Sequence, residues 1–309
     1  MMGRPLRFVP PGVSLVEITC RTVQGRFLLR PGKEANRRIR GVLGRALELH
    51  EGIELHAYVF LSNHYHLLLS TRSAQELAAF MGHLNGNLAR ELGRLHRWRE
   101  KFWGRRYRDI PVSNEESQQI QRLDYLLAQA SKEGLVASPR EWPGVTCVPA
   151  LLNRRPDVGI WHDRTSEYEA KRRREKIRPG QFHFEKILEL APLPCWQHLD
   201  ANAYRALIQE RVEVIEAQTR ERHERAGTRP RGRRAILRER PHHRPIRATR
   251  SPAPRFHCAT RAAREAMWTA YRLFVEAYRE AVARFRAGER HVSFPDGAFL
   301  PPIPLQAPG

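Results

Sequence analysis

The chain has 309 residues, with 54 Lys and Arg against 33 Asp and Glu, and its formal net charge at pH 7 is +21. Only six of the basic residues are lysine, and the planar guanidinium of the 48 arginines suits phosphate oxygens, so we expect a polyanionic partner. The 41% hydrophobic content excludes a wholly disordered chain, and no run approaches the roughly 18 apolar residues of a membrane span.

Regular hydrophobic patterning is concentrated in the first half of the chain. Apolar and polar residues alternate over residues 16–21, which predicts a half-buried strand, and apolar residues recur at helical spacing over 39–47. Two strand-like runs, 53–61 and 64–70, flank the short turn Ser62-Asn63. This arrangement predicts a β-hairpin.

Two further helices and a strand are predicted after the hairpin. Ser73 with Glu76 forms a capping-box pattern, from which a second helix continues to Leu95. A short strand is predicted over 107–112, followed by a third helix that opens at the capping pattern of Ser113 and runs to about residue 132. The order β-α-β-β-α-β-α predicts an α+β domain over residues 10–150, in which helices cover one face of an antiparallel sheet.

The second half of the chain is patterned differently. Residues 151–227 form a charged extension with a predicted helix over 201–226. Residues 228–255 carry ten arginines, one glutamate and several prolines, so they cannot bury enough apolar surface to offset the entropy of ordering, and we predict disorder. Residues 256–309 hold a last amphipathic helix, predicted over 267–285, and a tail.

The first motif that bears chemistry is Asn63-His64-Tyr65-His66 at the start of a predicted strand. Residues two apart in a strand project from the same face, so His64 and His66 point the same way. Two neutral imidazoles side by side make half of a metal site. Two histidines on a solvated strand face would give the same pattern, so the motif alone leaves both interpretations open.

The second motif is centred on Tyr125 in the third predicted helix. Leu123 belongs to the apolar stripe of this helix, and Tyr125 lies about 200° around the axis from it, at about 100° per residue. Gln129, four residues on, and Lys132, seven on, share the polar side with the tyrosine. An exposed tyrosine with polar neighbours by chance remains the alternative.

Together, the two motifs resemble those of the single-tyrosine, IS200/IS605-like HUH transposases, and most of all their REP-associated tyrosine transposase branch. These families pair the histidine strand with a downstream helix that carries one tyrosine, an Asn or Gln four residues later and a basic residue seven later, as Tyr125, Gln129 and Lys132 do. The segment Glu141-Trp142-Pro143 also resembles the family, whereas Asn-Pro is common where this chain has Gln129-Ala130. Glutamine is an accepted ligand in the insertion-sequence branch.

The resemblance implies a fold, a cofactor and a reaction. It implies an HUH, ferredoxin-like core in which His64, His66 and Gln129 hold a divalent metal, Mg²⁺ or Mn²⁺. Tyr125 is implied as the nucleophile that forms a 5′-phosphotyrosine on single-stranded DNA with hairpins such as REP-like repeats. The expected function is that of a DNA transposase, which cleaves and transfers single strands.

Aromatic and basic residues alternate over 102–108. Trp103 beside Arg105, Arg106 and Arg108 would suit a single-strand DNA surface, to which Lys132 would add a further cation. The same pattern also suits core aromatic residues before a strand, with solvated arginines.

The sequence leaves an alternative function and the assembly open. A non-catalytic, arginine-rich nucleic-acid-binding protein on the same scaffold is the alternative, and an RNA partner is a third possibility. The first twenty residues lack a signal-peptide core and the four cysteines form no CxxC pair, so we expect a cytoplasmic, nucleoid-associated protein without disulfides or a membrane partner. Both a monomer and a homodimer fit the resemblance.

Overall fold

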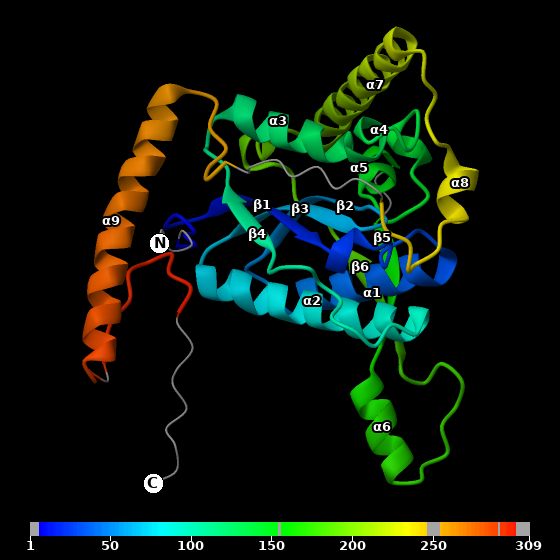
Figure 1. The fold of residues 1–309 in the computed structure, drawn as a ribbon, viewed down its shortest axis with the longest axis horizontal. Helices are drawn as coiled ribbons and strands as arrows, with labels where there is room; N and C mark the ends of the chain where they lie inside the picture. The colour runs from blue at the N-terminus through cyan, green and yellow to red at the C-terminus, as the bar shows by residue number, and fades with distance from the viewer. Residues whose placement is uncertain (1–5, 154–155, 246–253, 290, 301–309) are drawn as a thin grey trace.

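The protein's computed structural model describes residues 6–153, 156–245, 254–289 and 291–300. A four-stranded antiparallel sheet in the order β2-β3-β1-β4 forms the centre of the molecule (Figure 1). Its strands are β1 (Ser14–Arg21), β2 (Glu54–Phe60), β3 (His64–Thr71) and β4 (Arg108–Pro111). This sheet with its packed helices confirms the predicted α+β fold, including the hairpin of β2 and β3.

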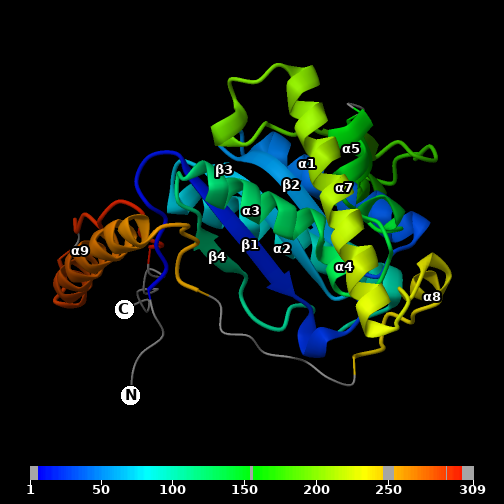
Figure 2. The same ribbon diagram turned by 90° about the horizontal axis from the view of Figure 1, so that it is seen from above.

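Helices cover both faces of the sheet (Figures 1 and 2). On one face lie α1 (Lys33–Leu49) and α2 (Ala74–His96), and on the other lies α3 (Glu116–Leu127), continued by α4 (Gln129–Lys132). The prediction that helices cover one face is therefore wrong in this respect. Because both faces are covered, β2 and β3 are buried along nearly their whole length, and Glu17 on β1 is only 4% exposed.

The sequence predicted the N-cap residue of α2 correctly but not that of α3. The Ser73 hydroxyl accepts a hydrogen bond from the backbone N–H of Glu76 at 3.1 Å, which confirms the cap of α2. The predicted cap of α3 at Ser113 is wrong, since the N-cap residue is Glu115. The Ser113 hydroxyl instead donates to the Glu115 carboxylate at 2.6 Å and so is held outside the helix.

The predicted third helix is divided into α3 and α4 at Ala128 (φ −74°, ψ −10°). The two pieces share a tight turn in which the N–H of Lys132 donates to the carbonyl oxygen of Ala128 at 2.7 Å. Gly134 adopts a φ of +67°, which a glycine tolerates without strain, and ends α4 as predicted. Tyr125 and Gln129 therefore lie on consecutive helical segments.

The remaining elements surround this core (Figures 1 and 2). A two-stranded antiparallel hairpin packs against α1, α6 projects from it, and α7 packs over α3, α4 and α5. The elements are α5 (Val148–Asn153), β5 (Asp157–His162), α6 (Arg164–Arg172), β6 (His183–Leu188), α7 (Ala201–Ala226), α8 (Arg233–Leu237) and α9 (Arg261–Arg286), with short 3₁₀ turns at η1 (Val23–Gly25), η2 (Pro139–Glu141) and η3 (Pro194–Trp196).

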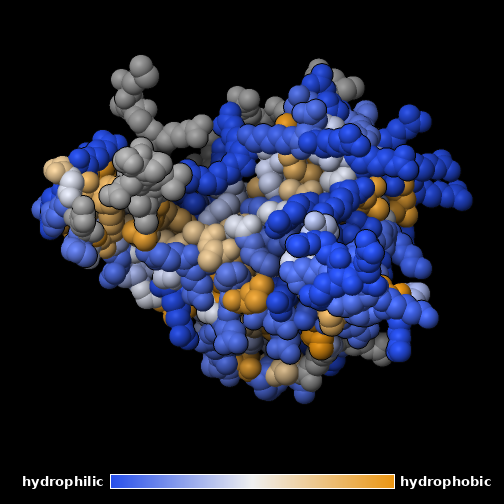
Figure 3. Space-filling view, turned by 90° about the horizontal axis from the view of Figure 1, so that it is seen from below, coloured by the Kyte–Doolittle hydropathy of each residue, from blue (hydrophilic) through white to orange (hydrophobic). Residues whose placement is uncertain are grey.

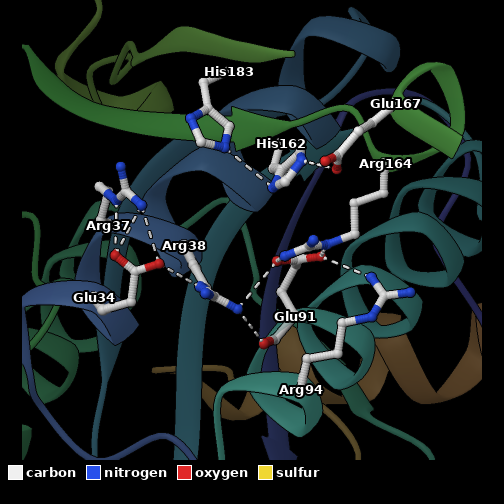
Figure 4. A network of polar contacts seen from close by, with 9 residues as sticks. All are labelled: Glu34, Arg37, Arg38, Glu91, Arg94, His162, Arg164, Glu167 and His183. Carbon is white, nitrogen blue, oxygen red and sulfur yellow. Dashed lines mark hydrogen bonds and ion pairs between the residues drawn. The ribbon is translucent and has the colours of Figure 1, made fainter. Parts of the chain in front are cut away.

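The buried carboxylate of Glu91 connects α6, the helix that follows β5, to α1 and α2 (Figure 4). Glu91 on α2 forms ion pairs with Arg164 at the start of α6, with Arg38 of α1 at 3.4 Å and with Arg94 of α2 at 3.2 Å. A buried carboxylate requires such partners, because an unpaired buried charge is costly. Glu91 is thus shared among three guanidinium groups.

Glycines allow β5 to approach α1 closely. A Cβ atom added at Gly41 would lie 2.0 Å from the carbonyl oxygen of Ile160. We expect Gly41→Ala to lower the free energy of unfolding by about 1–3 kcal/mol, because the hairpin must move away from the helix. Urea denaturation followed by circular dichroism measures this. Gly82→Ala on α2 is the control: apart from its chain neighbours and the nearby backbone of α2, no described atom lies within 4 Å of its added Cβ, so stability should rise by up to about 1 kcal/mol. Equal effects would contradict the close approach.

Residues 228–245 pack against the domain that contains the central sheet. They include α8, whose Ile236 is fully buried, and Glu239, whose carboxylate accepts a hydrogen bond from the Ser62 hydroxyl at 2.7 Å. The prediction of disorder is wrong for these residues, because one apolar side chain and a few specific polar contacts attach an otherwise arginine-rich segment. The rest of that prediction falls partly on residues 246–253, outside the described part of the chain.

The predicted helices of the second half are present as α7 and α9. α9 lies to one side of the molecule (Figures 1 and 2) and packs through a second apolar cluster. The buried members of that cluster are Phe8, Phe256, Tyr271, Phe274 and Ala298. No helix in the described part of the chain is both long and apolar enough to traverse a bilayer.

Candidate active site

The two histidines of the first motif lie side by side on the face of β3 that α3 covers. The ring centroids of His64 and His66 are 5.2 Å apart. His66 is buried and His64 is half-buried. Thr19 of β1 is the cross-strand partner of His66, so the histidine face continues onto the neighbouring strand.

The Nδ1 atom of each imidazole faces an acceptor on the protein. In His64 it lies 2.6 Å from the carboxamide oxygen of Asn63, and in His66 it lies 3.2 Å from a carboxylate oxygen of Glu17 and 3.1 Å from the hydroxyl of Thr19. Because carboxamide and carboxylate oxygens only accept, each Nδ1 carries a proton. In the neutral form of each ring the lone pair is then on Nε2, the atom that the ring can offer to a metal.

The state of His64 fits this role. Burial, followed by electrostatic interactions with His66 and Arg21, holds the pKa of His64 well below its usual value. The ring is therefore neutral at neutral pH, and a neutral imidazole is the form that binds a metal.

Glu17 is the charged centre behind the histidines. Burial alone would raise its pKa, but contacts with His257 and His66 outweigh burial and hold the pKa well below its usual range. The carboxylate is therefore ionised, and the Arg122 guanidinium lies 3.4 Å from Oε2. The sequence pattern does not reveal Glu17, because strand alternation predicts that its side chain lies on a solvated face, whereas α3 covers that face and Glu17 is buried.

Tyr125 of α3 packs against the histidine pair. Its ring centroid is 5.7 Å from that of His66, with the planes at 78°. The Lys132 ammonium lies 4.2 Å and the Arg122 guanidinium carbon 4.7 Å from the centre of the phenol ring, so two cations lie over it. The structure thus brings Tyr125, Lys132 and His66 together.

Gln129 is placed less directly. Its side chain is buried, and the carboxamide nitrogen donates to the carbonyl oxygen of Tyr125 at 3.0 Å. No hydrogen bond joins Gln129 to His64 or His66 among the residues that the structure describes. The side of the helix that was predicted to be polar is partly enclosed, because α7 packs over α3 and α4.

Within the same described residues, no three His, Cys, Asp or Glu side chains converge as a metal site. The candidate site offers two imidazoles. Any further protein ligand would therefore be a side chain of another kind, such as a carboxamide.

The predicted DNA-binding segment divides into a buried and an exposed part. The Trp103 indole N–H donates to the carbonyl oxygen of Asn85 at 2.9 Å, and its ring packs edge-on against Tyr65 at 5.6 Å. These contacts favour the interpretation of Trp103 as a core residue. The side chains of the three nearby arginines are exposed, and these are Arg105, Arg106 and Arg108.

An open, basic groove of about 670 Å³ lies at the end of α2. Figure 3 shows the side of the molecule that carries α1 and α2, where hydrophilic side chains cover most of the surface. Glu91 is shared between Arg94 of the groove and Arg38 and Arg164, and Glu100 also lines the groove, so the lining arginines remain in excess. The sequence pattern R-x₃-R-x₂-R-x-R was the signal that could have found it. Its lining includes Arg90, Arg94, Arg97, Trp98 and Arg99.

Residues 32–126 match the family model described as "Transposase IS200 like". Over these residues the chain is similar to IS200-like transposases. The resemblance inferred from the sequence motifs is thereby confirmed, and the matched segment includes both histidines and ends one residue after Tyr125. Gln129 and Lys132 lie just after the residues that match the family model.

Two solved structures are also similar to the chain. One is a REP-associated tyrosine transposase bound to a REP hairpin, with 15% identity, 50% of this chain and 87% of that chain covered, and a TM-score of 0.41. The other is a proposed transposase from Deinococcus radiodurans R1, with 21% identity, 40% and 95% covered, and a TM-score of 0.28. No curated protein matches the chain.

Proposed function

We propose that this protein is a DNA strand transferase of the transposase type, in which Tyr125 attacks a phosphodiester of single-stranded, hairpin-containing DNA. The observation that carries the proposal is the packing of the Tyr125 ring against His66 at 5.7 Å, within a segment similar to IS200-like transposases. A tyrosine beside a pair of imidazoles joins a nucleophile to side chains that can bind a metal.

In the proposed reaction the Tyr125 oxygen forms a bond to phosphorus while the bond from phosphorus to the 3′ oxygen breaks. The phenol proton passes to solvent, the 3′ oxygen takes up a proton, and the 5′ phosphate stays on the enzyme as phosphotyrosine. The covalent link conserves the phosphodiester, so reversal of the step joins strands without a nucleotide cofactor. Lys132 and Arg122, whose cationic groups both lie over the ring, would place positive charge beside the phosphate as the new bond forms.

The residues present fit a divalent metal. His64 and His66 present Nε2 atoms as ligands because their Nδ1 atoms are engaged. The nitrogen of the Gln129 carboxamide is also engaged, so its oxygen is the atom that would complete the protein ligands. Bound Mg²⁺ or Mn²⁺ would polarise the scissile phosphate and neutralise charge in the transition state.

Covalent capture tests the proposed function. A 3′-labelled hairpin DNA with a single-stranded extension, based on any palindromic repeat found in the DNA that flanks the coding region, is incubated with the protein and Mn²⁺, because the label must lie on the fragment whose 5′ phosphate stays on the tyrosine. We expect a labelled protein species that survives denaturing electrophoresis and is absent when EDTA replaces the metal. Saturable binding of such hairpins with no covalent species would instead support the non-catalytic nucleic-acid-binding protein, which the net charge of +21 also favours.

The partner proposed for the basic surface is the DNA backbone in the cytoplasm. The exposed Arg105, Arg106 and Arg108, with Lys132 beside the nucleophile, would contact phosphates near the site. Phe102 and Gly104 attach the loop after α2 to the end of β1, since their backbone groups bond to Val23 and Arg21. One loop therefore connects the basic groove to the end of the sheet at which His64 lies.

Salt dependence tests the groove. The double variant Arg97→Ala with Arg99→Ala removes two phosphate contacts. The plot of log affinity against log salt, which falls with salt, should become shallower by about 1.5–2, because each contact releases roughly one counterion. Fluorescence anisotropy of a labelled DNA hairpin over a NaCl series measures this slope. Arg172→Ala with Arg173→Ala, exposed at the end of α6, is the matched control and should leave the slope nearly unchanged. Equal slopes for the two double variants would exclude the groove as a contact.

A further inference from the structure

A segment of the C-terminal extension lies along β4, the edge strand of the central sheet. His257 forms a parallel bridge with Val112. Its N–H donates to the carbonyl oxygen of Pro111 at 2.9 Å, and its carbonyl oxygen accepts from the N–H of Ser113 at 2.8 Å. This backbone pairing brings a residue from outside the family-matched segment to the face of the sheet that carries the histidine pair.

The side chain of His257 reaches the buried carboxylate behind that pair. Its Nε2 lies 3.0 Å from Oε2 of Glu17, and the imidazole is only 11% exposed. The other carboxylate oxygen of Glu17 lies 3.2 Å from Nδ1 of His66. Arg122, whose guanidinium lies over the Tyr125 ring, contacts Oε2 as well. Glu17 therefore joins the histidine side of the site to the tyrosine side.

We propose that His257 is a positioning residue for His66 and acts through Glu17. A carboxylate that faces the Nδ1 of a ligating histidine fixes the orientation and the tautomer of the ring, and hence the direction of its Nε2. Glu17 keeps this orientation only if its second oxygen is also held, and His257 and Arg122 hold it. The inference rests on the proposed function, because it assigns His66 to metal binding.

A purely structural role makes a different prediction. If His257 only docks the extension on β4, its backbone bonds to Pro111 and Ser113 do that work and persist without the imidazole. Phe256, which precedes it, is buried in the apolar cluster of α9 and docks the same segment without touching Glu17. Substitution of Phe256 therefore tests the docking of the segment, and substitution of His257 tests the positioning of Glu17.

The test is Mn²⁺ affinity of the full chain without DNA, measured by electron paramagnetic resonance of free Mn²⁺. We expect His257→Ala to weaken binding about 10–100-fold. His257→Gln, whose amide N–H can approach Oε2 of Glu17 as the imidazole Nε2 does, should restore most of the affinity. Phe256→Ala should lower the melting temperature but weaken Mn²⁺ binding less than His257→Ala does.

The outcomes distinguish this inference from the proposed function. Wild-type affinity in His257→Ala, or a loss in Phe256→Ala as large as in His257→Ala, would overturn the positioning role and leave the metal site standing. Absence of saturable Mn²⁺ binding by the wild-type chain would overturn the proposed metal site and the inference with it.

Discussion

Replacing Tyr125 by phenylalanine is expected to abolish covalent capture of DNA and to leave DNA binding intact. The substitution removes only the oxygen that would bond to phosphorus, so capture should fall by about a thousandfold or more, as for loss of other covalent nucleophiles. The ring, and with it the packing against His66 and the contacts with Lys132 and Arg122, stays in place. Denaturing electrophoresis measures capture, and fluorescence anisotropy of the same DNA measures binding.

Tyr107 provides the matched control for this experiment. Its hydroxyl is buried and the Arg7 guanidinium lies 4.3 Å from the centre of its ring, away from the histidine pair. Burial raises the pKa of Tyr107, which makes its phenolate harder to form. Tyr107→Phe should therefore capture DNA as the wild type does. Capture that persists in Tyr125→Phe but disappears in Tyr107→Phe would reassign the nucleophile.

The parts of the fold that the sequence predicted are those with a local physical cause. Alternation with period two placed β1, two strand-like runs around a short turn placed the hairpin of β2 and β3, and helical spacing placed α1, α2 and α9. The proximity of His64 to His66 follows from the strand period alone. Such features depend on neighbours within a few residues, which a single sequence displays.

The parts that it missed depend on contacts between distant segments. Glu17 and His257 are 240 positions apart and meet only because the extension pairs with β4. The burial of Glu17 likewise requires α3 to cover a face whose strand pattern suggests solvent. The break at Ala128 is a tertiary effect of the same kind, since no helix-breaking residue marks it in the sequence. Each miss is a place where packing overrides the local pattern.

Loss of either imidazole is expected to remove Mn²⁺ binding and covalent capture together. His64→Ala or His66→Ala takes away one of the two nitrogen ligands proposed for the metal, so capture should fall by about a hundredfold or more. The two variants should differ in stability. His66→Ala deprives the buried Glu17 carboxylate of a partner and should cost about 1–3 kcal/mol, whereas the Nδ1 partner of His64 is only the half-buried Asn63.

A second close pair of histidines in the molecule provides the control. His162 and His183 lie opposite one another on β5 and β6, with ring centroids 4.4 Å apart, near the Glu91 network (Figure 4). His162→Ala should leave both Mn²⁺ affinity and capture at the wild-type level, because this pair belongs to the separate β5–β6 hairpin and not to the central sheet. Retained Mn²⁺ binding in His64→Ala and His66→Ala, together with its loss in His162→Ala, would place the metal at the hairpin and overturn the site proposed beside Tyr125.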